Sequence, residues 1–110
     1  MAVDELLLAN GRLAVGLDKH GQARDLYFPY VGQENHIPVG RSIHKIGLYI
    51  DGNLSWFDDG SWTTQQSYHK QALVSQTILT NEVRGLRVEM TSAVDARDDC
   101  FVRDIHIVNL

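Results

Sequence analysis

The sequence is poor in residues that mark several classes of protein. It has a single cysteine and only two prolines among its 110 residues. One cysteine precludes an internal disulfide, so we expect a reducing, cytoplasmic location. No hydrophobic run approaches the roughly 20 residues of a membrane-spanning helix. The short run Leu6 to Leu8 follows Asp4 and Glu5 instead of the basic start of a signal peptide.

The chain also lacks a cluster of positive charge. Its 10 basic and 14 acidic residues are scattered along the sequence and give a net charge of -4. A protein that follows a phosphate backbone needs grouped lysines and arginines. We therefore expect neither a nucleic-acid nor a membrane partner. What the chain does have is 44% hydrophobic residues, which is the make-up of one soluble globular domain.

Apolar and polar residues alternate with a period of two along most of the chain, and glycine-containing turns interrupt the alternation. This pattern predicts half-buried β-strands. The predicted strands cover residues 12–18, 23–28, 42–51, 53–57, 73–80, 86–91 and 101–110. No segment has the i, i+3, i+4 apolar spacing of a helix. The expected fold is all-β: residues 1–110 form one antiparallel β-sandwich domain of seven or eight strands, with little or no helix.

The connections between these strands differ in how clearly they are marked. Asp51-Gly52 is the strongest hairpin signal, because both residues tolerate positive φ. Residues 61–71 are polar and indicate no definite element. The last strand reaches Leu110 without a turn, which suggests the N-terminal piece of a larger protein. Such a piece, with unpaired strand edges, is expected to self-associate.

Few residues are arranged for chemistry. Asp58 and Asp59 are adjacent, so on a strand they would point to opposite faces, and next to Gly60 they are expected to form a turn. The five histidines include no H-x-H or H-x-x-x-H pair. We therefore expect no catalytic residue, no cofactor and no metal site in this chain.

Aromatic residues lie among polar ones in two regions. Trp56, Trp62 and Tyr30 have Asp, Asn or Gln nearby, a combination typical of sugar-binding surfaces. The same residue types also belong on strands and at the edges of cores. Both interpretations remain open from the sequence.

The stretch DLYFPYVGQENH, residues 25–36, predicts a shaped loop because Pro29 fixes φ and Gly32 permits unusual φ. Pro29 also ends the preceding strand, since it cannot donate to a sheet ladder. Two interpretations of the polar residues Glu34, Asn35 and His36 stay open. They contact a ligand or a neighbouring domain, or they hydrogen-bond the loop's own backbone.

Two stretches together resemble a known family. They are LANGRLAVGLDKHGQARDLYFPYVGQENH and IGLYIDGNLSWFDDGSW, and they are similar to the N-terminal β-sandwich domain of bacterial and archaeal glucoamylase-like proteins, glycoside hydrolase family 15. The similarity covers about residues 8–62, and the tail FVRDIHIVNL is similar to a later strand of that domain. The resemblance implies the first half of a two-sheet super-sandwich, joined by a linker to an (α/α)6 barrel that cleaves α-glucosidic bonds with inversion.

The resemblance also implies a division of labour. The family's catalytic glutamates lie in the barrel, so this chain is expected to be inactive alone and to scaffold or dock the catalytic domain of the same polypeptide. The parent protein is expected to hydrolyse an α-glucan or α-glucoside, as a glucoamylase or trehalase does. The expected contacts with the barrel are Tyr27, Tyr30, Glu34 and Asn35. The alternatives are a free-standing carbohydrate-binding β-sandwich using Trp56, Trp62 and Tyr30, and a small independent enzyme.

Overall fold

The computed structural model of the chain describes residues 5–29, 34–37, 44–69 and 73–110. Throughout these ranges the structure is all-β, and every strand pair is antiparallel. The strands are β1 (Leu6–Ala9), β2 (Ala14–Leu17), β3 (Ala23–Tyr27), β4 (Gly47–Ile50), β5 (Asn53–Trp56), β6 (Thr63–Tyr68), β7 (Val74–Asn81), β8 (Leu86–Val94) and β9 (Phe101–Asn109). They form a sheet β1-β2-β3, a hairpin β4-β5 and a sheet β6-β7-β8-β9.

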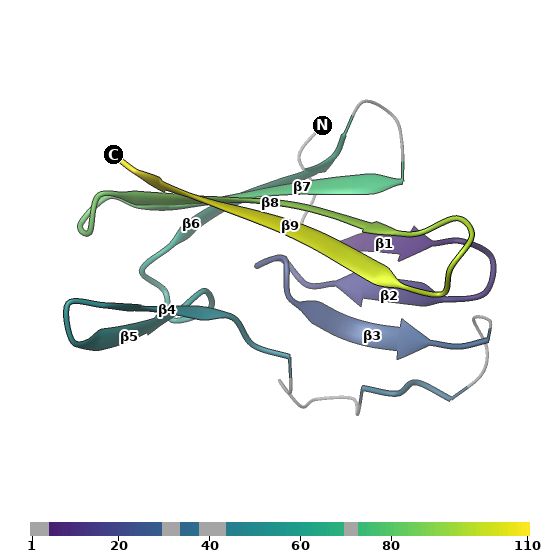
Figure 1. Ribbon diagram of the computed structural model, residues 1–110. Coiled ribbons are helices and arrows are strands. Elements are labelled where there is room, and N and C mark those ends of the chain that lie inside the picture. Colours follow the sequence, from purple (N-terminus) through teal and green to yellow (C-terminus); the bar gives the residue numbers. More distant parts are fainter. Residues whose placement is uncertain (1–4, 30–33, 38–43, 70–72) are drawn as a thin grey trace.

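The sheets pack in two layers. The four-stranded sheet forms one layer, and the sheet β1-β2-β3 and the hairpin β4-β5 lie next to each other in the other (Figure 1). The predicted antiparallel β-sandwich is confirmed. No helix in the described residues is long and apolar enough to cross a membrane.

Two separate apolar clusters lie between the layers. The first joins the small sheet to the ends of β8 and β9, and its buried members are Leu6, Leu8, Leu13, Val15, Leu17, Ala23, Ile37 and Val94. The second joins the β4-β5 side to the large sheet, and its buried members are Phe57, Trp62, Leu79, Val88 and Met90. Leu8 and Val15 of the first cluster and Val88 of the second are fully buried. The first cluster therefore packs the sheet β1-β2-β3 against the large sheet, and the second cluster packs the β4-β5 side against it.

Buried polar residues also connect the layers. Thr77 Oγ1 donates to Gln66 Oε1 at 2.6 Å, and Gln66 Nε2 donates to the backbone oxygen of Asp18 at 2.9 Å. Gln22 Oε1 accepts from the backbone N–H of Ile46 at 2.8 Å. Because these side chains replace water as hydrogen-bond partners for the turns between strands, their burial costs little.

The Asp51-Gly52 hairpin is confirmed. Asp51 has a φ of 50° and Gly52 a φ of 80°, which are the two positive values that a two-residue hairpin turn requires. The strands on either side are shorter than the predicted 42–51 and 53–57, since β4 covers Gly47–Ile50 and β5 covers Asn53–Trp56. Residues 42 and 43 lie outside the described part of the chain.

The sequence pattern gave no sign of two strands that the structure contains. Leu6 to Leu8 belongs to β1, which alternates between buried and exposed positions and pairs with β2. The run is too short, and too uniformly apolar, for periodicity to reveal it. β6 lies within the polar segment 61–71, and the buried residue of the strand itself is Gln66. A strand whose inward side chains are polar shows no apolar alternation.

β2 was expected to be half-buried, and this expectation is wrong. All four of its residues are buried. β2 is the central strand of its sheet, and its second face carries only Ala14 and Gly16. The larger side chains of β3 close over these small residues: a Cβ on Gly16 would lie 2.9 Å from Asp25 Oδ2. Small residues in the middle of a sheet are therefore covered by their neighbours.

Candidate functional site

A pocket of about 440 Å³ opens at one end of the small sheet. Its walls come from segments distant in sequence, namely the start of β2, the end of β3 with the following loop, and the turn that leads into β9. The lining residues are Leu13, Leu26, Phe28, His36, Asp99 and Phe101. Four of these six are apolar, so the pocket offers mainly hydrophobic surface with one imidazole and one carboxylate.

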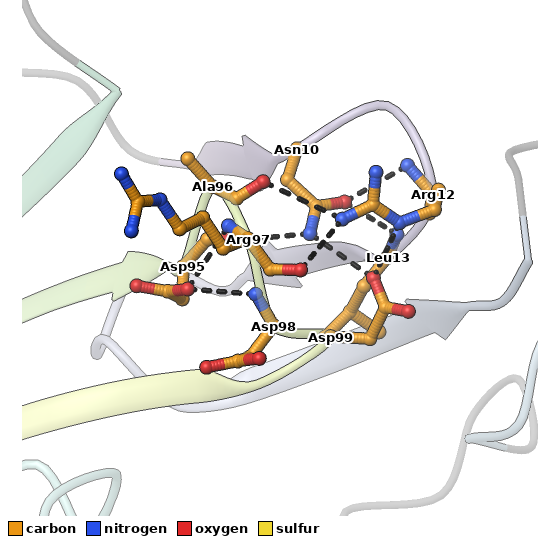
Figure 2. Close-up of polar contacts among 8 residues, drawn as sticks. All are labelled: Asn10, Arg12, Leu13, Asp95, Ala96, Arg97, Asp98 and Asp99. Carbon is orange, nitrogen blue, oxygen red and sulfur yellow. Dashed lines mark hydrogen bonds and ion pairs between the residues drawn. The ribbon is translucent and has the colours of Figure 1, made fainter.

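Asn10 connects two of these walls (Figure 2). Its side-chain oxygen accepts from the backbone N–H groups of Arg12 and Leu13, both at 2.8 Å. Its Nδ2 donates to the backbone oxygen of Asp95 at 2.8 Å and to Asp99 Oδ1 at 3.2 Å. One amide therefore orders the turn before β2 and joins it to the turn before β9, across 85 positions of sequence.

Asp99 is held in place by an ion pair. Arg12 Nε donates to Asp99 Oδ1 at 2.8 Å, and the same guanidinium donates to the backbone oxygens of Ala96 and Arg97 (Figure 2). Both side chains of the pair are partly exposed, so the attraction contributes little free energy but fixes geometry. Asp99 thus presents a carboxylate to the pocket with its negative charge already balanced by Arg12.

The turn that carries Asp99 is stabilised from within. The carboxylate of Asp95 accepts from the backbone N–H of Asp98 at 2.7 Å and from that of Arg97 at 3.0 Å. These two hydrogen bonds, with the Asp98 bond the stronger influence, lower the pKa of Asp95 because they favour its charged form. Residues 95–99 therefore form an ordered turn between β8 and β9.

The opposite wall depends on Asn35. Its Oδ1 accepts from the backbone N–H of Leu26 at 2.9 Å and of Ile37 at 3.0 Å, and its Nδ2 donates to Asp25 Oδ1 at 2.9 Å. Asn35 therefore hydrogen-bonds the backbone of its own loop and of β3, which is the support role left open by the sequence. The backbone N–H of His36 donates to Leu26 O at 2.8 Å and so places His36 beside the pocket.

The other loop residues singled out from the sequence lie in different surroundings. Tyr27 ends β3 opposite Ala14 and is half-buried. Glu34 is exposed, and Tyr30 lies outside the described residues. Among the described residues of this loop, the exposed aromatic residue is Phe28, which is 42% exposed and lines the apolar pocket.

The two tryptophans do not share one surface. Trp62 is 8% exposed, packs edge-on against Phe57 at 5.2 Å, and donates from Nε1 to Ser55 Oγ at 2.9 Å. It belongs to the core and leaves little ring surface for a ligand. Trp56 is 37% exposed, with Lys45 Nζ 5.0 Å from its ring centroid.

Asp58 and Asp59 lie in the turn that follows β5, as predicted. The Asp59 carboxylate accepts from the hydroxyl and backbone N–H of Ser61 and from the hydroxyl of Ser55. These bonds, led by the Ser61 hydroxyl, lower the pKa of Asp59. Asp58 pairs with Lys45 at 3.3 Å. The two carboxylates have separate partners and do not act on one common point.

The chemistry available at the pocket is recognition of an apolar group. The lining holds a single carboxylate, Asp99, whereas acid–base hydrolysis of a glycoside uses two. Across the described ranges, no three His, Cys, Asp or Glu side chains gather where they could hold a metal ion. Apolar walls with one polar residue on each side suit a side chain or ring that is mainly hydrophobic.

Sequence reasoning missed most of the pocket. It selected the loop that contains Phe28 and His36, but not Leu13, Asp99 or Phe101, which complete the lining. The usable signal was Asn10-Gly11 and Asp95 to Asp99, two polar turn segments that the structure brings together through Asn10. Nothing in the spacing shows that one amide would join them.

Known proteins add nothing to this geometry. Comparisons of the chain with protein-family models, with curated proteins and with solved structures found no match. The resemblance to family 15 hydrolases therefore rests on sequence motifs, and the chemistry of the pocket rests on its walls.

Proposed function

We propose that this chain is a non-catalytic β-sandwich domain that docks a second domain of the same polypeptide at the Phe28 pocket. The observation that carries the proposal is an exposed phenylalanine beside an apolar pocket whose walls are held rigid by Asn10 and Asn35. Covering apolar surface stabilises a contact by about 25 cal/mol per Å². A prearranged pocket also loses little conformational entropy when it is filled.

The resemblance to family 15 hydrolases supports the identity of the partner. The second domain would be an (α/α)6 barrel that hydrolyses an α-glucan or α-glucoside with inversion, and the catalytic pair would lie there. The pocket agrees with this division, because its one carboxylate, Asp99, is already paired with Arg12, and its lining holds no second carboxyl group for the inverting reaction. The isolated chain is then expected to show no turnover of α-glucosides.

The docking proposal makes two linked predictions. The reading frame beyond Leu110 encodes a helical domain, and Phe28→Ala weakens the contact between the domains. In the two-domain protein we expect Phe28→Ala to lower the melting temperature by several degrees and to reduce hydrolysis of maltooligosaccharides. In the isolated chain the same change alters melting little, because Phe28 is already 42% exposed there.

Tyr49→Ala is the matched control. Tyr49 is an aromatic residue that is 76% exposed on the β4-β5 hairpin, away from the pocket lining. It should leave both melting and hydrolysis unchanged. Equal behaviour of the two variants in the two-domain protein, or a reading frame with no second domain, contradicts docking at Phe28.

A carbohydrate-binding module is the second candidate, and one observation favours it. Tyr49, Leu54 and Trp56 share the outer face of the β4-β5 hairpin, and all three are exposed. Exposed aromatic rings on a flat sheet face can stack on sugar rings. Saturable quenching of tryptophan fluorescence by maltooligosaccharides, lost in Trp56→Ala, would support this candidate over docking.

A further inference from the structure

β9 is an unprotected edge of the four-stranded sheet. Its nine residues, FVRDIHIVN, contain neither proline nor glycine, and no other described strand pairs with its outer side. Natural edge strands are commonly short or bulged, or carry proline or inward-pointing charged residues, because a regular edge pairs with other chains. β9 has one inward-pointing charge, Arg103, but its guanidinium is hydrogen-bonded to Ser92 and Gly21 of the same chain. The register of β9 with β8 runs from Phe101 to Asn109 without a shift.

The backbone groups on this edge can be assigned. Leu110 N donates to Gly85 O at 2.8 Å, and Asp95 N donates to Cys100 O at 3.0 Å. These pairs lie in register with the β8-β9 ladder, so the even-numbered residues of β9 form its hydrogen-bonded pairs with β8. The odd-numbered residues therefore direct their N–H and C=O groups to the free edge. They are Phe101, Arg103, Ile105, Ile107 and Asn109.

The outer side chains of β9 are self-complementary about Ile105, whereas on the inner face only the central Ile105 pair joins like residues. If β9 meets an antiparallel copy of itself there, Ile105 faces Ile105 of the copy on the inner surface. On the outer surface Asp104 then faces His106, and Val102 faces Val108. Asp104 and His106 form non-hydrogen-bonded pairs, in which opposite Cα atoms are only about 4.5 Å apart. The imidazole N–H can donate to the carboxylate in both symmetry-related pairs.

Neighbouring registers lack this complementarity. A shift that centres the pairing on Asp104 brings two carboxylates face to face, and like charges directly opposite are destabilising. A shift that centres it on His106 places two imidazoles together and leaves Asp104 opposite Val108. Only the Ile105 register pairs each acidic residue with an imidazole and each outer valine with a valine.

We propose that β9 pairs with β9 of a second copy of this chain, antiparallel and centred on Ile105. The two four-stranded sheets then become one eight-stranded sheet with a two-fold axis at Ile105. The proposal stands independently of the proposed function, because it uses the strand edge instead of the Phe28 pocket.

Partly exposed apolar side chains give the pairing a hydrophobic contribution. Ile105 is 44% exposed and Ile107 is 52% exposed, although their neighbours on β8, Met90 and Val88, are fully buried. The inner surface of the sheet is thus covered at β8 but not at its edge. An adjoining copy of β9 removes part of this apolar area from water.

The side-chain test exchanges the complementary pair. Asp104→His places imidazole opposite imidazole in the dimer, and His106→Asp places carboxylate opposite carboxylate. Each single variant should weaken dimerisation about tenfold in sedimentation velocity, and the double exchange should restore it to within about threefold of wild type. Circular dichroism and melting of each variant check that the monomer stays folded.

The backbone test uses proline. Ile105→Pro removes an N–H that points to the free edge and keeps all hydrogen bonds to β8, so the chain should remain folded and become monomeric. Ile105→Val retains the N–H and should still dimerise. A wild-type chain that sediments as a monomer at all accessible concentrations, or a double exchange as weak as the single variants, would overturn the proposal.

Discussion

Arg103 is a cation placed where a β-sandwich normally has apolar residues. It lies on the inner face of β9, opposite Ser92, and donates to Ser92 Oγ and to the backbone oxygen of Gly21. Its guanidinium carbon is 5.0 Å from the ring centroid of Phe101. Desolvation by burial lowers the pKa of Arg103 to about 10, and the Asp18 carboxylate offsets only part of this effect. The residue joins the turn before β3 to the large sheet at an electrostatic cost.

The charge of Arg103 also affects His44. The pKa of His44 is lowered below the 6.5 of an unperturbed imidazole, mainly because the ring is partly buried and secondly because the Arg103 cation lies nearby. His44 Nδ1 accepts from the backbone N–H of Ala23 at 2.9 Å, so the ring must be neutral at that nitrogen. Protonation would remove the acceptor and place a second cation beside Arg103.

A pH dependence of stability follows from His44. Its folded-state pKa is lowered, so the unfolded chain binds more protons between that value and about pH 6.5. The contribution of His44 to stability is therefore complete above about pH 6.5 and is lost as the pH falls through the lowered pKa. We expect the free energy of unfolding in urea to decrease modestly over this range.

His44→Gln is the control for this prediction. The glutamine side-chain oxygen can accept from Ala23 but does not titrate, so the decrease below pH 6.5 should become shallower. Asp59 and Asp95, whose pKa values are also lowered, titrate at lower pH and stay charged in this range. An unchanged slope in His44→Gln would assign the effect to another group.

Among the elements, the turn between β2 and β3 lies close against the large sheet. Gly21 has a φ of 78°, and a Cβ there would lie 2.8 Å from Thr77 Cγ2 and 2.9 Å from Met90 Cε. Both contacts belong to the large sheet. The glycine is required for two reasons, because the backbone is left-handed and because the neighbouring sheet leaves no room.

Two alanine variants separate these reasons. Gly11 has a φ of 93° with nothing near its Cβ position, so Gly11→Ala should cost only the backbone strain, about 1 kcal/mol. Gly21→Ala adds overpacking against the large sheet and should cost about 1–3 kcal/mol more. Urea denaturation of both variants gives the comparison. Equal losses would mean that Thr77 and Met90 move aside at little cost.

The elements were predictable where their pattern is local. Asp51-Gly52 and the alternation of Leu86, Val88 and Met90 are read directly from neighbouring residues. β6 escaped prediction because its inward residue, Gln66, is polar, and hydrogen bonds with Thr77 and with the backbone of Asp18 help to stabilise this polar side chain there. Trp62, the buried apolar residue next to β6 in the sequence, lies just before the strand begins.

At the scale of the whole molecule, two apolar clusters share one large sheet. Val15 belongs to the first cluster and Val88 to the second, and both are fully buried. Buried polar side chains such as Gln22 and Gln66 also lie between the layers. Because the two valines belong to different clusters, a cavity made in one cluster should leave the packing of the other cluster unchanged.

Val15→Ala and Val88→Ala test this separation. Each should reduce the free energy of unfolding by about 2 kcal/mol, and the double variant should lose the sum to within about 0.5 kcal/mol. The measurement is urea denaturation with a constant slope against denaturant. A loss in the double variant well away from the sum would show that the clusters are coupled through the sheet.

The all-β class, the antiparallel connections and the end of β3 before Pro29 could be read from the sequence, because alternation and turn chemistry depend on residues close together in the chain. The predicted loop shape at Gly32 lies outside the described residues. Tertiary structure alone decided which apolar residues share a cluster and that Trp62 is core while Phe28 is exposed. It also decided that Asn10 meets Asp99 across the end of the sandwich. These outcomes depend on which strands become neighbours in space, and pairing between distant strands leaves no periodic signal in the sequence.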